Sequence, residues 1–394
     1  MQIIDFSEWH TLVAGILALV IGHFLSQVFS VFRRYSIPEA IVGGIFISCI
    51  ILVLERYAGL KIQFSTGIRD ILLLVFFVSI GLGARIKSLL AGGKQFVLLC
   101  FITVLLLFLQ NAVGIAVAKL FGRNPLYGLL GGSVSFVGGP GTALAWSKEM
   151  AAFGLKGAEV FAISAATFAV VSGSMLGGPL ITWLIKKYNL KSDKVKPAKI
   201  DHVDKQPETF TTWDIIRVLM IIAVSIVAGG FLKDYTLKIG LTIPGFLCAL
   251  IISLLIGNLA GARMVKETPV IDRIGELSLQ FFLAISLMGL KLTMVGPFLI
   301  PLLFLVLVQI ALCFAVGYFI LFPLLGRTYE AAIVFAGFFG FSISSMPVAM
   351  AGMEQLTKRY GPAPHAVLLI TLCGSFFVDL ANAVVVTLFL SWFK

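Results

Sequence analysis

A break rich in glycine and proline interrupts an apolar stretch between residues 125 and 150, where the chain reads Gly138-Gly139-Pro140-Gly141-Thr142. Pro140 has no N–H, and the glycines weaken the helix around it. In lipid such a break survives only where protein buries it or where it lines a watery cavity. Carbonyls left unpaired before the break can coordinate a cation such as sodium, and N–H groups that start the next helix can face an anion. The alternative is a tight glycine-rich helix crossing with no ligand.

The helix before the break is too short to span a membrane. Residues 125–137 allow about a dozen helical residues, or about 18 Å, against a hydrocarbon core of about 30 Å. The chain must therefore turn back, which predicts a re-entrant hairpin over 125–150 with Thr142 placed to cap the second arm or to ligate an ion.

A second break lies in the other half of the chain, in a predicted hairpin over 327–353. There Ser342, Ser344 and Ser345 precede Met346 and Pro347. Hydroxyls at membrane depth can serve an ion or a carboxylate, although a single serine more often bonds back to its own helix. As a cluster that mirrors the first break, these serines are candidates for the other half of one site.

Polar residues within three apolar segments complete the candidates. Asp379 lies in the last segment, followed by Asn382, and an ionised carboxylate at the centre of a span costs about 2.5–3.5 kcal/mol, so it should face protein, water or a cation. It predicts a sodium or proton site, with a structural hydrogen bond as the alternative. Gln110-Asn111 and Gln309 occupy equivalent places in two spans. They could form hydrogen bonds between helices or act as ion ligands, and for the glutamines we favour the hydrogen bonds between helices. The candidate substrate-binding residues are Ser135, Gly138, Gly139, Pro140, Gly141, Thr142, Ser344, Ser345 and Met346, and the candidate sodium ligands are Asn111, Thr142, Ser345, Asp379 and Asn382.

The composition defines the class of protein that holds these groups. Hydrophobic residues make up 59% of the 394 residues and charged residues 12%, against about a quarter in soluble domains. Repeated apolar runs of membrane-spanning length predict an all-α integral membrane protein. The formal charge of +11 is spread over short loops, which argues against nucleic acid as a partner. The five cysteines stand singly and predict free buried thiols rather than a disulfide or metal framework. No enzyme motif is present, and we expect no cofactor.

The apolar segments predict about ten transmembrane helices in two similar halves. The first half, 1–190, has predicted spans at 9–31, 37–54, 70–84, 96–121 and 159–185, and the second half, 213–394, at 213–232, 243–259, 271–290, 298–322 and 366–392. A polar linker, 191–212, separates the halves.

Short motifs recur in the same order in both halves. Ser36-Ile37-Pro38 matches Thr242-Ile243-Pro244, Phe76-Phe77 matches Phe281-Phe282, and Gly122-Arg123 matches Gly326-Arg327. Because each half has an odd number of spans, the two repeats must cross the membrane in opposite senses. Inverted repeats whose discontinuous segments meet near the midplane are typical of secondary transporters.

The distribution of basic residues predicts the orientation. With both termini outside and the linker cytoplasmic, the inner side receives 19 of the 30 lysines and arginines and the outer side the other 11. An excess of basic residues belongs on the cytoplasmic side. The first hairpin then enters from outside and the second from the cytoplasm.

Over nearly its full length the chain resembles the bacterial sodium/glutamate symporters. The resemblance rests on Ser36-Ile37-Pro38-Glu39, Gln110-Asn111-Ala112-Val113-Gly114-Ile115, Gly138-Gly139-Pro140-Gly141-Thr142 with Ala145-Trp146-Ser147-Lys148, Leu287-Met288-Gly289-Leu290-Lys291-Leu292, Arg359-Tyr360-Gly361-Pro362, and Asp379 with Asn382-Ala383. It implies sodium-coupled import of L-glutamate or a related acidic amino acid across the bacterial inner membrane, by alternating access with an elevator-like step in a homodimer.

Two departures from the family pattern fall at the breaks. Pro140 stands where glutamate transporters of this family tend to have histidine, and Ser342–Pro347 replaces a sequence richer in glycine and threonine. The alternatives are therefore a sodium- or proton-coupled carrier of another carboxylate, or a sodium/proton antiporter that works through Asp379. A passive channel or a structural membrane subunit is the alternative from a different class.

Overall fold

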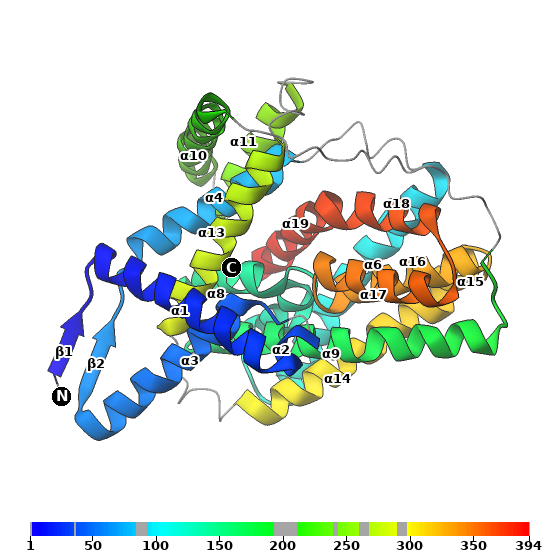
Figure 1. Cartoon of the computed structure of the whole chain (residues 1–394), viewed down its shortest axis with the longest axis horizontal. Helices are drawn as coiled ribbons and strands as arrows, with labels where there is room; N and C mark the ends of the chain where they lie inside the picture. The colour runs from blue at the N-terminus through cyan, green and yellow to red at the C-terminus, as the bar shows by residue number, and fades with distance from the viewer. Residues whose placement is uncertain are drawn as a thin grey trace. The chain divides into compact units, whose positions relative to one another are not determined.

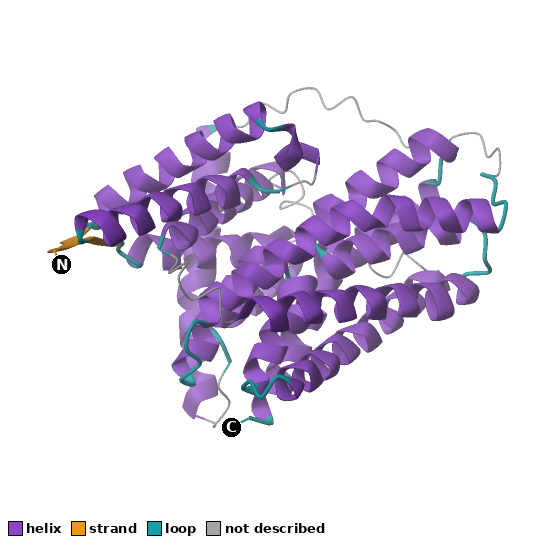
Figure 2. Ribbon diagram, turned by 90° about the horizontal axis from the view of Figure 1, so that it is seen from below, coloured by secondary structure: helices purple, strands orange, loops and turns teal. Residues whose placement is uncertain are grey.

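The structure, a computed structural model, describes residues 2–34, 37–83, 93–192, 211–238, 243–259, 268–289 and 298–393. Most of the predicted linker lies outside these ranges, as do Ser36, Thr242 and the segment 290–292 of the quoted motifs. The described chain is almost entirely helical (Figure 2).

Helices of the first half agree closely with the predicted spans and hairpin. They are α1 (Glu8–Val28), α2 (Ser30–Arg34), α3 (Glu39–Val53) with η1 (Leu54–Ala58), α4 (Gly67–Gly83), α6 (Gly93–Leu120), α7 (Pro125–Leu129) with η2 (Leu130–Val134), α8 (Gly139–Ala152) and α9 (Ala158–Lys187).

Helices of the second half follow the same order. They are α10 (Thr212–Lys238), α11 (Gly245–Leu259), α13 (Thr268–Met288), α14 (Leu299–Ala315) with η5 (Val316–Leu321) and α15 (Phe322–Leu324), α16 (Tyr329–Ile343), α17 (Met346–Tyr360), and α18 (Pro364–Leu372) with η6 (Cys373–Phe377) and α19 (Val378–Ser391).

The helices have the length and composition of a membrane protein. Among the described residues, six helical segments are long and apolar enough to cross a membrane, and shorter apolar helices accompany them. The chain is therefore a helical multi-pass membrane protein, as the composition predicts.

Two details differ from the sequence expectations. The short strands β1 (Gln2–Asp5) and β2 (Leu60–Gln63) pair in parallel, so the chain is not purely helical. This pairing satisfies backbone groups next to α1 and after η1 that no helix accommodates. The prediction that every cysteine is buried is wrong for Cys49, which lies on an exposed part of α3 with Ile50 and Val53.

The chain divides into two compact units, each drawn from both halves of the sequence. The first unit consists of Met1–Arg85 and Thr209–Gly296, and the second consists of Ile86–Glu208 and Pro297–Lys394. The first unit thus contains the first three spans of each half, and the second contains the remaining spans with both hairpins.

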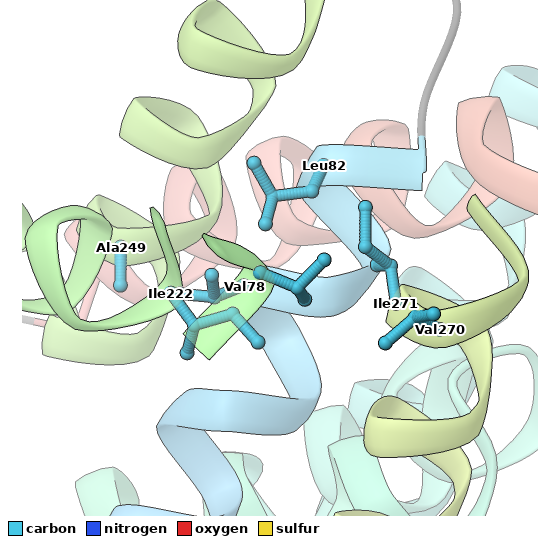
Figure 3. Close-up of a cluster of buried hydrophobic side chains, with 7 residues drawn as sticks. Val78, Leu82, Ile222, Ala249, Val270 and Ile271 are labelled. Atoms are coloured by element: carbon cyan, nitrogen blue, oxygen red, sulfur yellow. The ribbon is translucent and has the colours of Figure 1, made fainter. Parts of the chain in front are cut away.

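The first unit has a core of aliphatic side chains where α4 packs against α10, α11 and α13 (Figure 3). Val78 and Leu82 of α4 meet Ile222, Ala249 and Ile271 there. The helices α1, α3 and α10 of this unit also have exposed apolar side chains, which suits lipid contact. In the most apolar 18-residue stretch of α10, only 22% of the residues are buried.

Glycines allow helix backbones of the first unit to touch. A Cβ added at Gly43 of α3 would lie 1.8 Å from the Ala18 carbonyl oxygen of α1. Similarly, a Cβ added at Gly229 of α10 would lie 2.6 Å from the Ala249 Cα of α11. Small residues permit this close packing, which is common between membrane helices.

In the second unit both hairpins pack against long helices (Figure 1). The helix α6 packs against the hairpin segments α7 and η2 and against α19, whereas α9 packs against α8, α14 and α16. Buried positions run along the whole of α16, from Tyr329 to Ile343. The first break and the whole of α16 are therefore enclosed by protein, the condition under which an irregular segment is tolerated at membrane depth, whereas α17 also has exposed residues such as Glu354 and Lys358.

Candidate functional site

The first break starts earlier than the sequence predicts. The turn η2 is π-helical, and Gly132 within it leaves the helical region at φ −94° and ψ −138°. The helix α8 begins at Gly139, which has φ +67°, in the left-handed region that favours glycine. Pro140 lies in the first turn of α8, where its missing N–H costs no hydrogen bond. The break thus covers residues 132–139, and Pro140–Thr142 begin the second arm.

An amide from α6 holds the first break. The Asn111 side-chain oxygen accepts hydrogen bonds from the Ser133 N–H at 3.1 Å and the Ser133 hydroxyl at 3.0 Å. On the other side, the Asn382 amide of α19 donates to the Ser133 carbonyl at 3.2 Å. Any Cβ at Gly132 would lie 2.6 Å from the Asn111 oxygen, so a glycine is needed for this approach. Asn111 and Asn382 therefore converge on one residue of the break.

The second break separates α16 from α17. The helix ends at Ile343, and Ser344 follows with φ −141° and ψ −80°. Ser345 is extended and starts α17, with Pro347 in the first turn. The Ser342 carbonyl accepts a hydrogen bond from the Gln110 amide of α6 at 2.9 Å. The residue next to Asn111 thus holds the second break.

A second glutamine links the two breaks. The Gln309 amide of α14 donates to the Gln110 carbonyl at 2.8 Å and to the Gly131 carbonyl at 3.3 Å. Gly131 immediately precedes the first break, and Gln110 contacts the second. The prediction that these glutamines hold helices together is consistent with these bonds.

The tips of the two hairpins lie next to each other. A Cβ added at Gly139 would lie 3.3 Å from the Ser344 carbonyl oxygen. The helix α9 contacts the same tip, since a Cβ at Gly173 would lie 3.1 Å from the Ser344 Cβ. Two breaks that are about 200 residues apart in the chain therefore form one polar region within the second unit.

Several buried polar atoms in this region have no hydrogen-bond partner among the described residues. Five are oxygens that could coordinate a cation, and one is an amide nitrogen that could donate to an anion. The oxygens are Gln110 Oε1, Gln309 Oε1, Ser342 Oγ, Ser344 Oγ and Asn382 Oδ1, and the nitrogen is Asn111 Nδ2. An unpaired buried polar group costs about 1–3 kcal/mol, so a cluster of them calls for a ligand or water. Oxygen donors suit hard cations such as sodium.

The structure places the predicted substrate residues in different surroundings. The Ser135 hydroxyl donates to the Ala162 carbonyl of α9 at 3.1 Å, a bond that serves helix packing. Ser344 is fully buried, whereas Ser345 is only half-buried at the start of α17. Met346 packs on η6, because a Cβ at Gly374 would lie 2.3 Å from the Met346 sulfur. Of these four, Ser344 is the one whose hydroxyl is both buried and unpartnered at the tip.

The predicted ion ligands also differ in their surroundings. Thr142 packs its methyl side against Gly138, where an added Cβ would lie 2.5 Å from the Thr142 Cγ2. Asp379 is half-buried one turn before Asn382 on α19, so the two side chains lie on one face of that helix. Within the described ranges, the Asp379 carboxylate forms no ion pair. Asn111 and Asn382 are the predicted ligands that the structure brings together.

Two further residues contact the candidate ligands, although the lists of candidate substrate and sodium residues do not include them. Ser133 is hydrogen-bonded to both Asn111 and Asn382, and Gln110 donates to the Ser342 carbonyl. The signal for Ser133 was present, since its hydroxyl lies within a few residues of the predicted break. The position of a hydroxyl in the sequence alone could not show whether it bonds to a neighbouring helix or faces the polar region between the two breaks.

Broken helices with a buried, unsatisfied polar centre, set within a bundle of apolar spans, define the class of membrane transporters with discontinuous helices. Comparison with known proteins agrees with this class. The sodium/glutamate symporter family profile matches residues 4–362. The chain belongs to the sodium/glutamate symporter family, and it is a transporter rather than an enzyme.

Individual relatives match almost from end to end. The sodium/glutamate symporter of Escherichia coli K12 is 35% identical over 387 residues, which cover 96% of each chain. The sodium/glutamate symporter of Haemophilus influenzae Rd is 35% identical over 390 residues, again covering 96% of each. Among solved structures, the sodium proton antiporter MjNhaP1 from Methanocaldococcus jannaschii aligns with 98% of this chain and 97% of its own, with a TM-score of 0.46 and 16% identity. That likeness is too low to support a statement about this chain.

Proposed function

We propose that this chain is a sodium-coupled secondary transporter that imports L-glutamate or a related acidic amino acid. The observation that carries the proposal is the meeting of two hairpin tips among buried, unpartnered oxygens. Membership of the sodium/glutamate symporter family supports the same coupling ion and solute class.

The roles of the residues follow from their chemistry. Oxygens of Ser342, Ser344 and Asn382 are candidate sodium ligands, with the Asp379 carboxylate supplying the negative charge that favours a cation. The Asn111 amide and the first N–H groups of α8 are candidate donors to the solute carboxylate, because a helix N-terminus attracts anions. Thr142 lies in that first turn and can serve either ligand.

The driving force sets a minimum stoichiometry. Moving one charge through 100 mV supplies about 2.3 kcal/mol, and each 1.4 kcal/mol gives about tenfold accumulation. A solute with one net negative charge must therefore travel with at least two sodium ions for the membrane potential to assist uptake.

We further propose that the chain consists of two inverted repeats, 1–190 and 213–394. The pairing of helices within the first unit supports this: α1 contacts α3 as α10 contacts α11, and α3 contacts α13 as α11 contacts α4. The charge distribution supports external termini and a cytoplasmic linker in a bacterial inner membrane. In an elevator-like cycle the unit with the hairpins carries the solute. A homodimer is part of the same proposal.

The test uses purified protein in proteoliposomes with an inward sodium gradient. We expect labelled L-glutamate to accumulate, and uptake that is indifferent to sodium would disprove the coupling. Aspartate, dicarboxylates and a proton gradient, applied in turn, separate the alternative substrates and coupling ions. Proton release without organic solute would instead indicate a sodium/proton antiporter.

A matched variant sharpens this test. Thr142→Val keeps the shape of the side chain and removes its hydroxyl, so we expect weaker sodium dependence with normal membrane insertion. An unchanged sodium titration in this variant would remove Thr142 from the ion site.

A further inference from the structure

A lysine near the end of α9 is fixed by aromatic rings on two helical segments. The Lys187 amine lies 4.6 Å from the centroid of the Trp183 ring and 5.2 Å from that of Tyr318, a residue of η5. It donates a hydrogen bond to the Tyr318 hydroxyl at 2.8 Å, and the Tyr188 and Tyr318 hydroxyls are 3.0 Å apart. An exposed lysine is normally mobile, so these contacts hold the charge in one place.

A second cation lies beside this cluster. The Arg327 N–H donates to the Phe322 carbonyl at 3.1 Å, and the Phe322 ring packs against that of Tyr188 with centroids 5.5 Å apart. Its backbone has φ +54°, in the left-handed region, and the next residue, Thr328, caps α16. Such a backbone conformation is uncommon for a residue other than glycine. Arg327 therefore presents its charge from the turn at which the second hairpin begins.

Apolar side chains surround the two cations. Trp183 is 45% exposed, Leu324 is 58% exposed and Phe319 is 71% exposed. Within the described ranges, neither Lys187 nor Arg327 forms an ion pair with an acidic side chain. The surface thus combines two positive charges without a counter-charge, two hydroxyls and a flanking apolar area at the end of a membrane span.

We propose that this cluster binds an anionic phospholipid. Its phosphodiester accepts hydrogen bonds from Lys187 and Arg327, and its acyl chains lie over Trp183, Phe319 and Leu324. Basic pockets between helices at the membrane surface bind anionic headgroups in this way. The exposed apolar side chains favour a lipid over a soluble phosphate, which has no group to cover them.

The lipid would connect α9 to the start of the second hairpin. Lys187 ends α9, and Arg327 immediately precedes the cap of α16. A bound headgroup neutralises both cations and holds this turn in its left-handed conformation. The inference concerns binding, so it stands or fails separately from the identity of the transported solute.

The experiment is native mass spectrometry of the detergent-purified full chain, titrated with phosphatidylglycerol and, in parallel, with phosphatidylcholine of the same acyl composition. We expect tighter binding of phosphatidylglycerol, and about fivefold weaker binding after either Lys187→Gln or Arg327→Gln, from about 1 kcal/mol per basic residue near a membrane. Lys186→Gln is the matched control, because Lys186 is the exposed neighbour on the same helix and lies outside the aromatic cluster.

Each outcome has a defined meaning. Loss in the Lys187 and Arg327 variants but not in the Lys186 variant supports the site, and Lys187→Arg, which keeps the charge, should restore binding. Equal binding of both lipids, or an equal loss in all three glutamine variants, overturns the proposal. Displacement of the lipid by millimolar inorganic phosphate would show that the site takes soluble anions instead, which also overturns it.

Discussion

The two units handle buried polar groups differently. In the first unit, Ser79, Ser225 and Ser253 are buried, and each hydroxyl donates to a carbonyl of its own helix at 2.8–2.9 Å. In the second unit, polar side chains bond between helices, as Gln110 does with Ser342, and unpartnered atoms gather around the two breaks. In the first unit Ser26, Gln280 and Ser286 also have an unpartnered oxygen, but they lie in unbroken helices. Self-contained polar groups let helices pack in lipid without further partners. Unsatisfied groups around broken helices instead favour a ligand or water as their partner.

The same contrast holds for glycine. In the first unit, glycines such as Gly43 and Gly229 let straight helices touch. In the second unit, Gly132 and Gly139 allow the backbone to leave the helix. Glycine thus serves helix packing in the first unit and a break in the helix in the second. Substitutions of glycine in the two units should therefore have different consequences.

The largest expected effect is that of Asp379→Asn. If the carboxylate faces sodium in the loaded protein, its loss should raise the sodium concentration for half-maximal uptake about a hundredfold, since breaking a buried charge pair costs about 3–5 kcal/mol. Sodium titration of glutamate uptake measures this change. Glu276→Gln in α13 of the first unit is the control, because Glu276 is exposed and pairs with Arg273 at the surface. Equal effects of the two variants would contradict a role for Asp379 in the ion site.

The next effect is that of Asn111→Ala. This change removes the acceptor of both the Ser133 N–H and the Ser133 hydroxyl. We expect a loss of about 2 kcal/mol in substrate binding, or about thirtyfold, because two buried donors lose their partner. Ser225→Ala, which removes a hydroxyl that serves only its own helix, should leave binding unchanged. Glutamate-dependent thermal shifts of the purified variants compare them.

A glycine pair in α10 tests the packing role in the first unit. Gly229→Ala should lower stability by about 1–3 kcal/mol, since the new Cβ would meet the backbone of Ala249. Its neighbour provides the control, because nothing lies within 4 Å of a Cβ at Gly230, and Gly230→Ala should be neutral or gain up to about 1 kcal/mol of helix propensity. Thermal unfolding in detergent measures both, and similar melting temperatures would refute the close contact of α10 with α11.

The smallest expected effect distinguishes two unpartnered hydroxyls. Ser344→Ala should raise the stability of the ligand-free protein by about 1 kcal/mol, because it removes a buried group with no partner. It should also reduce the stabilisation by sodium and glutamate. Ser26→Ala in the first unit removes a hydroxyl that is equally unpartnered, so it should give the same gain without affecting ligands. A full ligand response in Ser344→Ala would exclude this hydroxyl from the site.

Much of the fold could be predicted because its signals are local. Apolar runs fix where spans occur, and Gly138–Gly141 and Ser345–Pro347 mark breaks, since proline and glycine act on their own helix. The additional kink at Gly132 was not predicted, because the π-helical segment η2 and the backbone of Gly132 depend on Asn111 of another helix. The two short strands were also missed, since four-residue segments have too little pattern to be recognised.

What the sequence by itself determined is the class of protein, the order of its helices and the two breaks, because membrane burial and helix geometry are set by neighbouring residues. The tertiary structure decided which polar atoms form hydrogen bonds between helices and which stay without a partner. The Gln110 amide reaches a carbonyl 232 residues away, and the Asn382 amide one 249 residues away. A hydrogen bond over such a separation depends on how helices pack, as does the choice between Ser135, which bonds to α9, and Ser344, which has a free hydroxyl at the tip. The break at Gly138–Thr142 was visible in the sequence, and the polar centre around it exists only in the folded chain.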